Sequence, residues 1–375
     1  MDFAFSEEQD MLRASAREFL AKECSSSYVR RVMDADGAWD EGLWKKLAEM
    51  GWTGLGIPEA HGGVGTFLDL VVILEEAGRA LLPGPFFSTM GLAVPALLEA
   101  GSEAQKQEVL TRIAAGDARA TVALTEPSGR WDAEGVALPA QRSGDGWRLD
   151  GVKLFVPDAA VADYTIVAAR TRSGGEDGIT LFLLSGRPEG VTVSPLKTMD
   201  MTRRWYEVRL DGVQVPDSAV MGAVDRGWAP LKRALDWGEA ALCAEMVGGA
   251  QHVLDTSVEY AKTRHQFGKP IGIYQAVSHK LADMKLRLET SHLIVHRAAA
   301  LLDADGASDL DCAMTKLHVS EALIANSLDA VQIHGGYGYM TETGLERDVR
   351  DALGGRIYSG TSELLRTVIA RHLGL

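Results

Sequence analysis

The spacing of hydrophobic residues along this chain changes twice and divides it into three parts. From about residue 5 to 118, apolar residues such as Leu43, Leu47 and Met50 recur every three or four positions, which is the spacing of amphipathic helices. Short apolar runs bounded by Gly, Pro and Asp follow from about residue 119, and long helical periods return from about residue 227. The pattern predicts an N-terminal helical domain, a central β domain and a C-terminal helical bundle, with boundaries at 1–118, 119–226 and 227–375.

The central part has the composition of β-strands. Its short runs are rich in β-branched and aromatic residues, and they cover 147–149, 152–155, 164–169, 179–184, 191–193, 205–210 and 213–215. Because no helical segments alternate with these runs, we expect an antiparallel β-barrel or sandwich rather than a parallel sheet. The predicted fold class is therefore α+β multidomain, with helical domains on either side of the β domain in the sequence.

Glycine and proline mark where helices stop in the two helical parts. Residues 57–63 (Ile-Pro-Glu-Ala-His-Gly-Gly) predict a turn between helices, and the Pro-Gly-Pro sequence at 83–85 ends a helix that runs from about Leu68 to Ala80. A helical period resumes from about residue 88 to 115. In the C-terminal part, helices are expected over 228–263, 275–303, 309–334 and 361–373.

The overall composition fits a globular chain and argues against several partners. Hydrophobic residues make up 46% and charged residues 24%, and the net charge is −14 without any Lys/Arg-rich run. We therefore expect neither a nucleic-acid-binding surface nor an anionic-membrane patch. No apolar run reaches the roughly 18 residues of a membrane span, and the first residues lack the segments of a signal peptide, so we expect a cytoplasmic protein.

The three cysteines, Cys24, Cys243 and Cys312, have neither the spacing of metal ligands nor that of a disulfide framework. We expect them to be reduced and structural, and we expect no metal site.

Residues 260–272 (Tyr-Ala-Lys-Thr-Arg-His-Gln-Phe-Gly-Lys-Pro-Ile-Gly) carry the most specific chemical signal. A helix that ends at Gly268 and Pro270 leaves Arg264 and Gln266 in a polar turn, where a guanidinium can bridge phosphate oxygens. On these residues alone, a plain helix end with a solvated arginine is the alternative.

Three further segments are compatible with cofactor binding, and each has a simpler alternative. Residues 332–339 (Gln-Ile-His-Gly-Gly-Tyr-Gly-Tyr) end a long helix with glycines, whose main-chain N–H groups can hold a pyrophosphate or merely cap the helix. Thr361 or Ser362 can cap the last helix, and the helix N-terminus favours an anion. Residues 125–127 (Thr-Glu-Pro) and 152–158 stand at the entry to the β region, where they can equally be strand ends.

Together, in this order and within this helix-β-helix layout, the four segments resemble the acyl-CoA dehydrogenase family over essentially the whole chain. The resemblance includes the start at Phe5 (Phe-Ser-Glu-Glu-Gln) and the turn at 57–63. It implies FAD as the cofactor, an acyl-CoA substrate, an electron-transfer flavoprotein as the electron acceptor and a role in lipid metabolism. In this family the ADP half of FAD is held by the neighbouring subunit, so a homo-oligomer is implied, typically a dimer of dimers (a homotetramer).

The resemblance also assigns roles to single residues. Leu124 and Thr125 would bond the pyrimidine edge of the flavin, and Phe155 and Val156 would cover one face of its ring. The residues implied to hold the pyrophosphate and adenosine across the subunit interface are Arg264, Phe267, Gln275, Gln332, Gly335 and Gly336, and those implied to close over the cofactor from the last helix are Thr361 and Glu363.

Three positions depart from the family pattern. The Thr-Glu-Pro loop usually continues as Gly-Ser-Asp, but here 128–132 reads Ser-Gly-Arg-Trp-Asp, with Trp131 in place of a small serine. Pro157 stands where many members have a threonine whose hydroxyl bonds the flavin N5 edge. Ser359 occupies the usual position of the catalytic glutamate, and a neutral serine cannot remove the substrate α-proton.

Other members of the family place the base on the helix before the Arg-x-x-Phe-Gly turn, at the position of Gly238 in this chain. Glu239 is adjacent and is the first candidate for the base. Glu245 returns to the same helical face but lies ~10 Å further along the axis, so it is the second candidate. A solvated or ion-paired helix glutamate is the alternative for both residues.

Two other functions stay open at this point. An acyl-CoA oxidase would pass electrons to oxygen instead of a flavoprotein. The three departures also suit a non-catalytic or half-site subunit, which would assemble as a heterotetramer with a homologous chain. The sequence does not indicate the length of the acyl chain, because apolar helix faces look alike whether they contact each other or a substrate.

Overall fold

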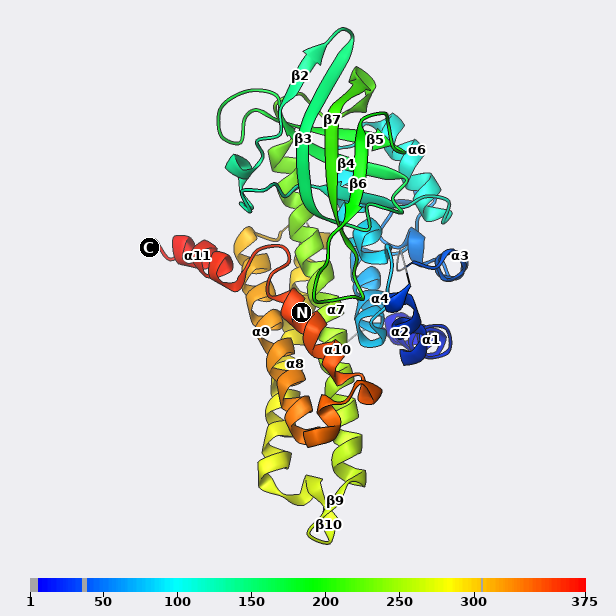
Figure 1. Cartoon of the computed structure of the whole chain (residues 1–375), viewed down its shortest axis with the longest axis vertical. Coiled ribbons are helices and arrows are strands. Elements are labelled where there is room, and N and C mark those ends of the chain that lie inside the picture. The colour runs from blue at the N-terminus through cyan, green and yellow to red at the C-terminus, as the bar shows by residue number, and fades with distance from the viewer. Residues whose placement is uncertain (1–5, 36–38, 305) are drawn as a thin grey trace. The chain divides into compact units, whose positions relative to one another are not determined.

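The computed structural model describes residues 6–35, 39–304 and 306–375 of the chain (Figure 1). Phe5, the first residue of the expected N-terminal motif, lies outside these residues. The chain divides into two compact units, of which the helical unit combines the residues up to Arg31 with Phe67–Leu82 and Glu239–Leu375. The β unit combines Val32–Thr66 with Pro83–Gly238. The predicted fold class is confirmed, whereas the domain boundaries at 118 and 226 stay predictions.

The helical unit consists of helices that bury their apolar stripes against one another. Its helices are α1 (Glu7–Glu23), the start of α2 (Ser26–Asp34), α4 (Phe67–Ala80), most of α7 (Trp228–Thr263), α8 (Gln275–Asp303), α9 (Asp309–His334), α10 (Leu345–Gly355) and α11 (Ser362–His372). Capping boxes at Ser6 and Ser308 satisfy the first N–H groups of α1 and α9. Helices α8 and α9 run side by side (Figure 1).

Helices α4 and α7 approach so closely that their main chains touch. A Cβ atom at Gly248 of α7 would lie 1.7 Å from the carbonyl oxygen of Glu75 in α4. In the reverse direction, a Cβ atom at Gly78 of α4 would lie 1.9 Å from the carbonyl oxygen of Glu245. The two glycines therefore set the distance between these helices.

The β unit contains two sheets that enclose its core. One sheet has the order β1 (Ala120–Ala123), β4 (Tyr164–Arg170), β5 (Ile179–Ser185), β8 (Val220–Met221), and the other has β2 (Ala140–Ser143), β3 (Gly146–Pro157), β7 (Trp205–Pro216), β6 (Val191–Pro195). Buried residues of both sheets, such as Leu149, Phe182 and Val208, form one cluster. Side chains alternate between the faces of a strand, so this cluster joins the inner faces of a sandwich.

The strands differ from the sequence prediction in three respects, of which the first is that β1, β2 and β8 were not predicted. The predicted runs at 147–149 and 152–155 belong to the single strand β3, and those at 205–210 and 213–215 belong to β7. The pairing register of β3 with β7 shifts between Leu149 and Gly151, which explains the apparent break. Strands β1 and β4 pair in parallel, unlike the expected antiparallel arrangement, because the chain crosses the other sheet between them.

Short helices complete the β unit. They are α3 (Glu41–Glu49), a π-helix (Phe87–Ala93), α5 (Val94–Ala100) and α6 (Glu103–Ala114). The expected helical stretch from 88 to 115 is thus interrupted, because Ser102 caps a new helix at α6. Across both units, 3₁₀ turns occupy Trp52–Gly54, Glu59–His61, Ala133–Gly135, Asp217–Ala219, Ile271–Ile273, Gly335–Tyr339 and Thr341–Thr343.

The C-terminal helices largely match the prediction. Helices α7, α8 and α9 have the predicted bounds, and α11 is shorter than predicted by one residue at each end. Helix α10 was not predicted. The end of α7 at Thr263 agrees with the helical period and not with the motif, which was expected to end the helix at Gly268. Among the described residues, no helix combines the length and the hydropathy needed to cross a bilayer.

Candidate active site

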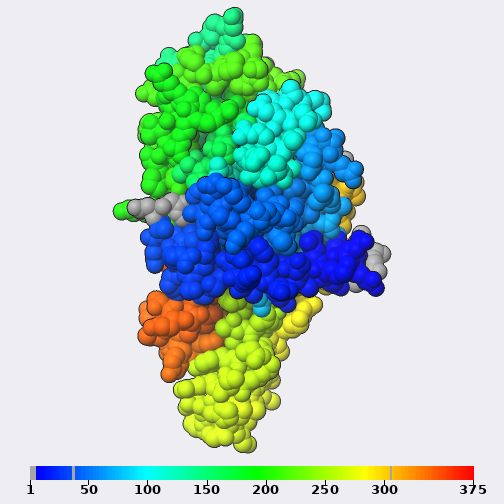
Figure 2. Space-filling model, turned by 90° about the vertical axis from the view of Figure 1, so that its right-hand side faces the viewer, coloured from blue at the N-terminus to red at the C-terminus, as the bar shows by residue number. Residues whose placement is uncertain are grey.

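A tight hairpin follows the end of α7. Strands β9 (His265–Gln266) and β10 (Lys269–Pro270) pair antiparallel, and the two residues between them, Phe267 and Gly268, have φ values of +52° and +77°. Positive φ at both central residues is typical of a type I′ turn, for which glycine is favoured. The turn leaves Arg264 beside the helix end and the Phe267 side chain 91% exposed. The end of α7 and the hairpin belong to the yellow-green to yellow part of the surface in Figure 2.

The hairpin borders a pocket of about 800 Å³. The pocket brings together Arg264, Phe267, Gly335 and Gly336, four of the residues predicted to hold the pyrophosphate and adenosine. Gln275 and Gln332 are exposed on α8 and α9 and do not line this pocket. The role of all six residues in binding FAD stays a prediction.

The pocket has the donors that a pyrophosphate requires. The Arg264 guanidinium lies 5.6 Å from the centre of the Tyr337 ring, on the side of the glycine-rich 3₁₀ turn. Gly335 has a φ of +58°, and a Cβ atom at Gly335 or Gly336 would meet no other heavy atom within 4 Å. The main chain here is therefore open to a ligand, and a phosphate can combine a guanidinium with backbone N–H groups. The residues fit the ADP half of FAD.

In the β unit, a buried ion pair fixes the Thr-Glu-Pro loop. The ammonium of Lys153, which is fully buried, donates to the carbonyl oxygen of Leu124 at 2.9 Å and to Oε1 of Glu126 at 2.6 Å. The same carboxylate oxygen accepts hydrogen bonds from the backbone N–H groups of Ala137 and Leu138 at 3.0 Å. Burial lowers the pKa of Lys153 to about 8, and the charge of Glu126 opposes this shift. The network holds the main chain at Leu124 and Thr125 in place.

A bulge in β3 turns the side chains of Phe155 and Val156 toward different environments. The pairing of β3 with β7 is irregular between Lys153 and Val156, and Phe155 has a φ of +52°. The Phe155 side chain is consequently 51% exposed, whereas that of Val156 belongs to the core of the sandwich. Of the two, only Phe155 has an exposed side chain. The carbonyl oxygen of Pro157 accepts a hydrogen bond from the hydroxyl of Thr121 at 2.6 Å.

The segment before α11 is held by a buried lysine. Lys316 of α9 is fully buried and donates to the carbonyl oxygen of Gly360 at 3.1 Å. The preceding residue, Ser359, has a φ of +52°, which is unusual for a residue with a side chain. Thr361 caps α11 by accepting from the N–H of Leu364, as predicted, and the Glu363 side chain is exposed.

Glu239 lies within electrostatic reach of this lysine. Burial lowers the pKa of Lys316, and the negative charges of Glu239 and Glu321 act in the opposite direction. The half-buried Glu239 on α7 therefore interacts with Lys316, which in turn contacts Gly360. Glu239 and Ser359 both belong to the helical unit, whereas Gly238 belongs to the β unit.

The other two positions of α7 considered for the base, Gly238 and Glu245, are less suited to that role. A Cβ atom at Gly238 would lie 2.5 Å from Cδ2 of Leu92, so a side chain there would displace the leucine. Glu245 is half-buried where the main chain of α7 contacts Gly78 of α4. The charge of Glu239 acts on Lys316, although the catalytic role of Glu239 stays a prediction.

Sequence reasoning missed Lys153, Glu126 and Lys316 as residues that support the site. One signal was present, since Lys153 interrupts the apolar run of a strand between Val152 and Leu154. A charged residue at a buried strand position requires a partner, but the sequence did not indicate which acidic residue supplies it.

The chain matches three family profiles of the acyl-CoA dehydrogenases: the N-terminal domain over 6–117, the middle domain over 121–213 and the C-terminal domain over 225–374. It is 34% identical to the caffeyl-CoA reductase-Etf complex subunit CarC of Acetobacterium woodii over 372 residues, which cover 98% of each protein. The structure of butyryl-CoA dehydrogenase from Megasphaera elsdenii superimposes with a TM-score of 0.94 at 31% identity, covering 100% of both chains. The FAD complex of PigA gives a TM-score of 0.92 at 31% identity, again covering 100% of both chains.

These matches confirm the resemblance seen in the sequence, and with it the predictions of FAD as the cofactor and of an oxidoreductase. They extend over all three predicted parts of the chain. The chain belongs to the acyl-CoA dehydrogenase family.

Proposed function

We propose that this protein catalyses the FAD-dependent α,β-dehydrogenation of an acyl-CoA thioester, with Glu239 as the catalytic base. The observation that carries the proposal is the interaction of Glu239 with Lys316, whose ammonium binds the carbonyl oxygen of Gly360. Gly360 follows Ser359, where the family's usual glutamate is missing. This interaction supports a carboxylate on α7 as the base in a chain whose C-terminal segment lacks one.

In the proposed reaction, the carboxylate of Glu239 takes the proton from the α-carbon of the thioester while a hydride leaves the β-carbon, and a double bond forms between the two carbons. FAD, when bound, supplies the acceptor of this hydride. The nearby cation of Lys316 stabilises the ionised carboxylate before the proton is transferred. Ser359 has no proton-accepting role in this scheme, because a hydroxyl is not ionised at ordinary pH.

We assign the remaining predicted residues to cofactor binding. Arg264 and the main chain at Gly335 and Gly336 would hold the pyrophosphate, with Phe267, Gln275 and Gln332 around the adenosine. In the β unit, Leu124, Thr125 and Phe155 would contact the flavin ring, and Val156 would contribute only its main chain, because its side chain lies in the sandwich core. Thr361 and Glu363 would close over the cofactor from α11. If a second subunit supplies the adenosine site, the protein is a homo-oligomer, and we propose a dimer of dimers.

We propose an electron-transfer flavoprotein as the electron acceptor. The name of the similar protein CarC, an Etf-complex subunit, supports this choice. We also propose a cytoplasmic location, because Cys24, Cys243 and Cys312 are buried free thiols, as expected in a reducing compartment.

The decisive experiment is anaerobic stopped-flow reduction of the bound flavin by acyl-CoA thioesters. Glu239→Gln keeps the shape of the side chain and removes its ability to accept a proton. We expect FAD and thioester binding to be retained and the rate of flavin reduction to fall by about 10²–10⁴-fold. Glu245→Gln and Ser359→Ala are the matched controls and should reduce flavin at nearly the rate of the unmodified protein.

Each contrary outcome has a specific meaning. Normal reduction in Glu239→Gln together with slow reduction in Glu245→Gln would assign the base to Glu245. If none of the acyl-CoA thioesters reduces the flavin of the unmodified protein, the dehydrogenase proposal fails and a non-catalytic subunit is indicated. Rapid formation of hydrogen peroxide in air would identify an oxidase and exclude the flavoprotein acceptor.

A further inference from the structure

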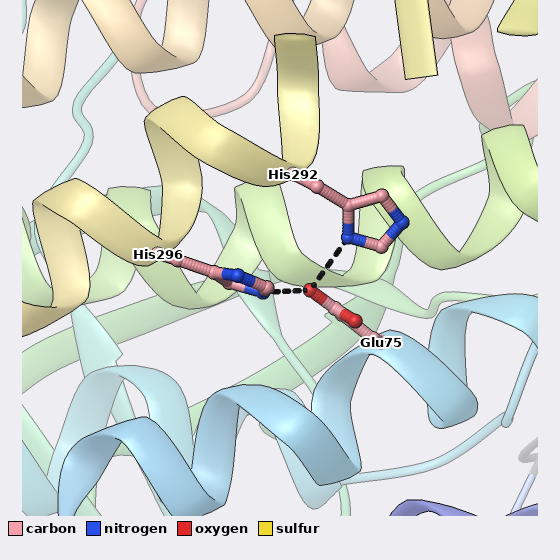
Figure 3. Close-up of side chains that lie close together, drawn as sticks. All are labelled: Glu75, His292 and His296. Atoms are coloured by element: carbon pink, nitrogen blue, oxygen red, sulfur yellow. Dashed lines mark hydrogen bonds and ion pairs between the residues drawn. The ribbon is translucent and has the colours of Figure 1, made fainter. Parts of the chain in front are cut away.

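A cluster of one carboxylate and two imidazoles lies within the helical unit, separate from the residues proposed for catalysis (Figure 3). His292 and His296 are one turn apart on α8, so they extend from the same face of that helix toward Glu75 of α4. Oε1 of Glu75 lies 2.7 Å from Nε2 of His296 and 3.4 Å from Nδ1 of His292. The three residues come from segments as much as 221 positions apart, so the sequence alone did not group them.

The carboxylate is held in a fixed orientation. The Glu75 side chain is only 3% exposed, and its second oxygen, Oε2, accepts a hydrogen bond from the guanidinium of Arg13 at 2.5 Å. Its own backbone oxygen lies against Gly248 of α7. Arg13 therefore occupies one carboxylate oxygen and leaves the other directed at the imidazoles. An outer partner of this kind orients a ligand, as around known metal centres.

The distances suit a small divalent ion. Zinc binds His nitrogen and carboxylate oxygen at ~2.0–2.1 Å in a tetrahedron, which places neighbouring ligand atoms ~3.3–3.4 Å apart. The separation of 3.4 Å between Nδ1 of His292 and Oε1 of Glu75 already has this value. The contact with His296, at 2.7 Å, would have to lengthen by ~0.6–0.7 Å to reach that spacing. All three ligand atoms lie within 4.8 Å of one another.

The ligand types agree with this ion. Two imidazoles and one carboxylate are a set that zinc accepts, and a fourth position then remains for water. The side chains of His292 and His296 are 20% and 15% exposed, so the cluster is partly accessible to solvent.

We propose that Glu75, His292 and His296 bind one zinc ion per chain, with water as the fourth ligand. The ion would join α4 to α8 and so stabilise the helical unit, without a part in the dehydrogenation. This proposal is independent of the proposed function and revises the expectation of no metal site, which was based on the cysteines alone.

The test uses the full-length, tag-free protein with FAD bound, treated with a chelator and then titrated with Zn²⁺ in a calorimeter. We expect saturation at one zinc ion per chain and a rise in thermal midpoint when zinc is present. His292→Gln and His296→Gln should each weaken binding at least tenfold and abolish the thermal shift. His318→Gln, which changes an exposed histidine on α9 that contacts Thr290, is the matched control and should bind zinc normally.

The flavin content of every variant is measured, so that a loss of zinc binding in a protein with full FAD cannot be attributed to unfolding. Glu75→Gln is less suited as the main variant, because it also removes the partner of Arg13. The proposal is overturned if the unmodified protein shows no saturable binding. It is equally overturned if the two His→Gln variants bind zinc as tightly as the control, since the cluster would then be an ion-paired network that holds only protons.

Discussion

Gly248→Ala tests the close packing of α4 on α7 by adding a single methyl group. The new Cβ atom would lie 1.7 Å from the carbonyl oxygen of Glu75 and 2.7 Å from the backbone nitrogen of Arg79. Ordinary contact requires roughly 3.4 Å, so the helices must separate locally by more than 1 Å or distort. Overpacking of this kind typically costs about 1–3 kcal/mol, whereas alanine gains about 1 kcal/mol over glycine in helix propensity. Because the contact is with backbone that cannot rotate away, we expect a cost at the upper end of that range and a net loss of about 2 kcal/mol.

The adjacent residue supplies the control. A Cβ atom at Gly249 would meet its nearest neighbour, Cδ1 of Leu323, at 3.4 Å, which is ordinary contact. Gly249→Ala should therefore be neutral or stabilise the helix by up to about 1 kcal/mol. The assay is the thermal midpoint of the FAD-bound protein, with the expected order Gly249→Ala at or above the unmodified protein and Gly248→Ala below it. Equal midpoints for the two alanine variants would refute the backbone contact between the helices.

Two further predictions concern charged groups. Arg264→Ala should weaken FAD binding by about 1.5–3 kcal/mol through the loss of a charge-assisted phosphate contact, as measured by FAD titration of the apoprotein, whereas Lys262→Ala at the same helix end should not. Burial raises the pKa of Asp348 from 3.8 to about 7, so the folded state holds the carboxyl proton more tightly than the unfolded state does. The protonated carboxyl therefore contributes to the free energy of unfolding. This contribution is complete below pH 3.8 and is lost as the pH rises to about 7. Relative to the unmodified protein, Asp348→Asn should therefore gain about 4 kcal/mol in unfolding free energy between pH 4 and pH 8, and a pH-independent difference in urea denaturation would contradict this.

The long helices could be predicted because their signals are local. Helices α8 and α9 have continuous apolar stripes, and α9 also has a capping box at Ser308. Helix α10 was not predicted, because it is short and its many charged residues obscure the apolar spacing of a helix. Two of those, Arg347 and Asp348, are buried, contrary to the usual pattern of polar residues on the outer face.

The sequence predicted the motifs of the candidate site but not the buried residues that hold these motifs in place. The segments around Arg264 and Gly335 were found because turns and glycines leave a local signature, and the structure brings both into one pocket. The pairing of Lys153 with Glu126 and that of Lys316 with Gly360 depend on segments that meet only after folding. The same holds for the Glu75 cluster, where each residue alone is an ordinary helix residue.

Helix α7 connects the two proposals and allows them to be tested separately. It carries Glu239 in its N-terminal half, and nine residues further on it contacts the backbone of Glu75 at Gly248. Nine residues correspond to ~13.5 Å along a helix axis, which is too far for a metal ion at Glu75 to act directly on the proton that Glu239 removes. Removal of zinc should therefore lower the thermal midpoint without changing the rate of flavin reduction. Glu239→Gln should slow flavin reduction without changing the thermal midpoint. If zinc removal instead slowed flavin reduction at constant FAD content, α7 would transmit strain between the two sites, and the base and the metal site would have to be treated as one coupled system.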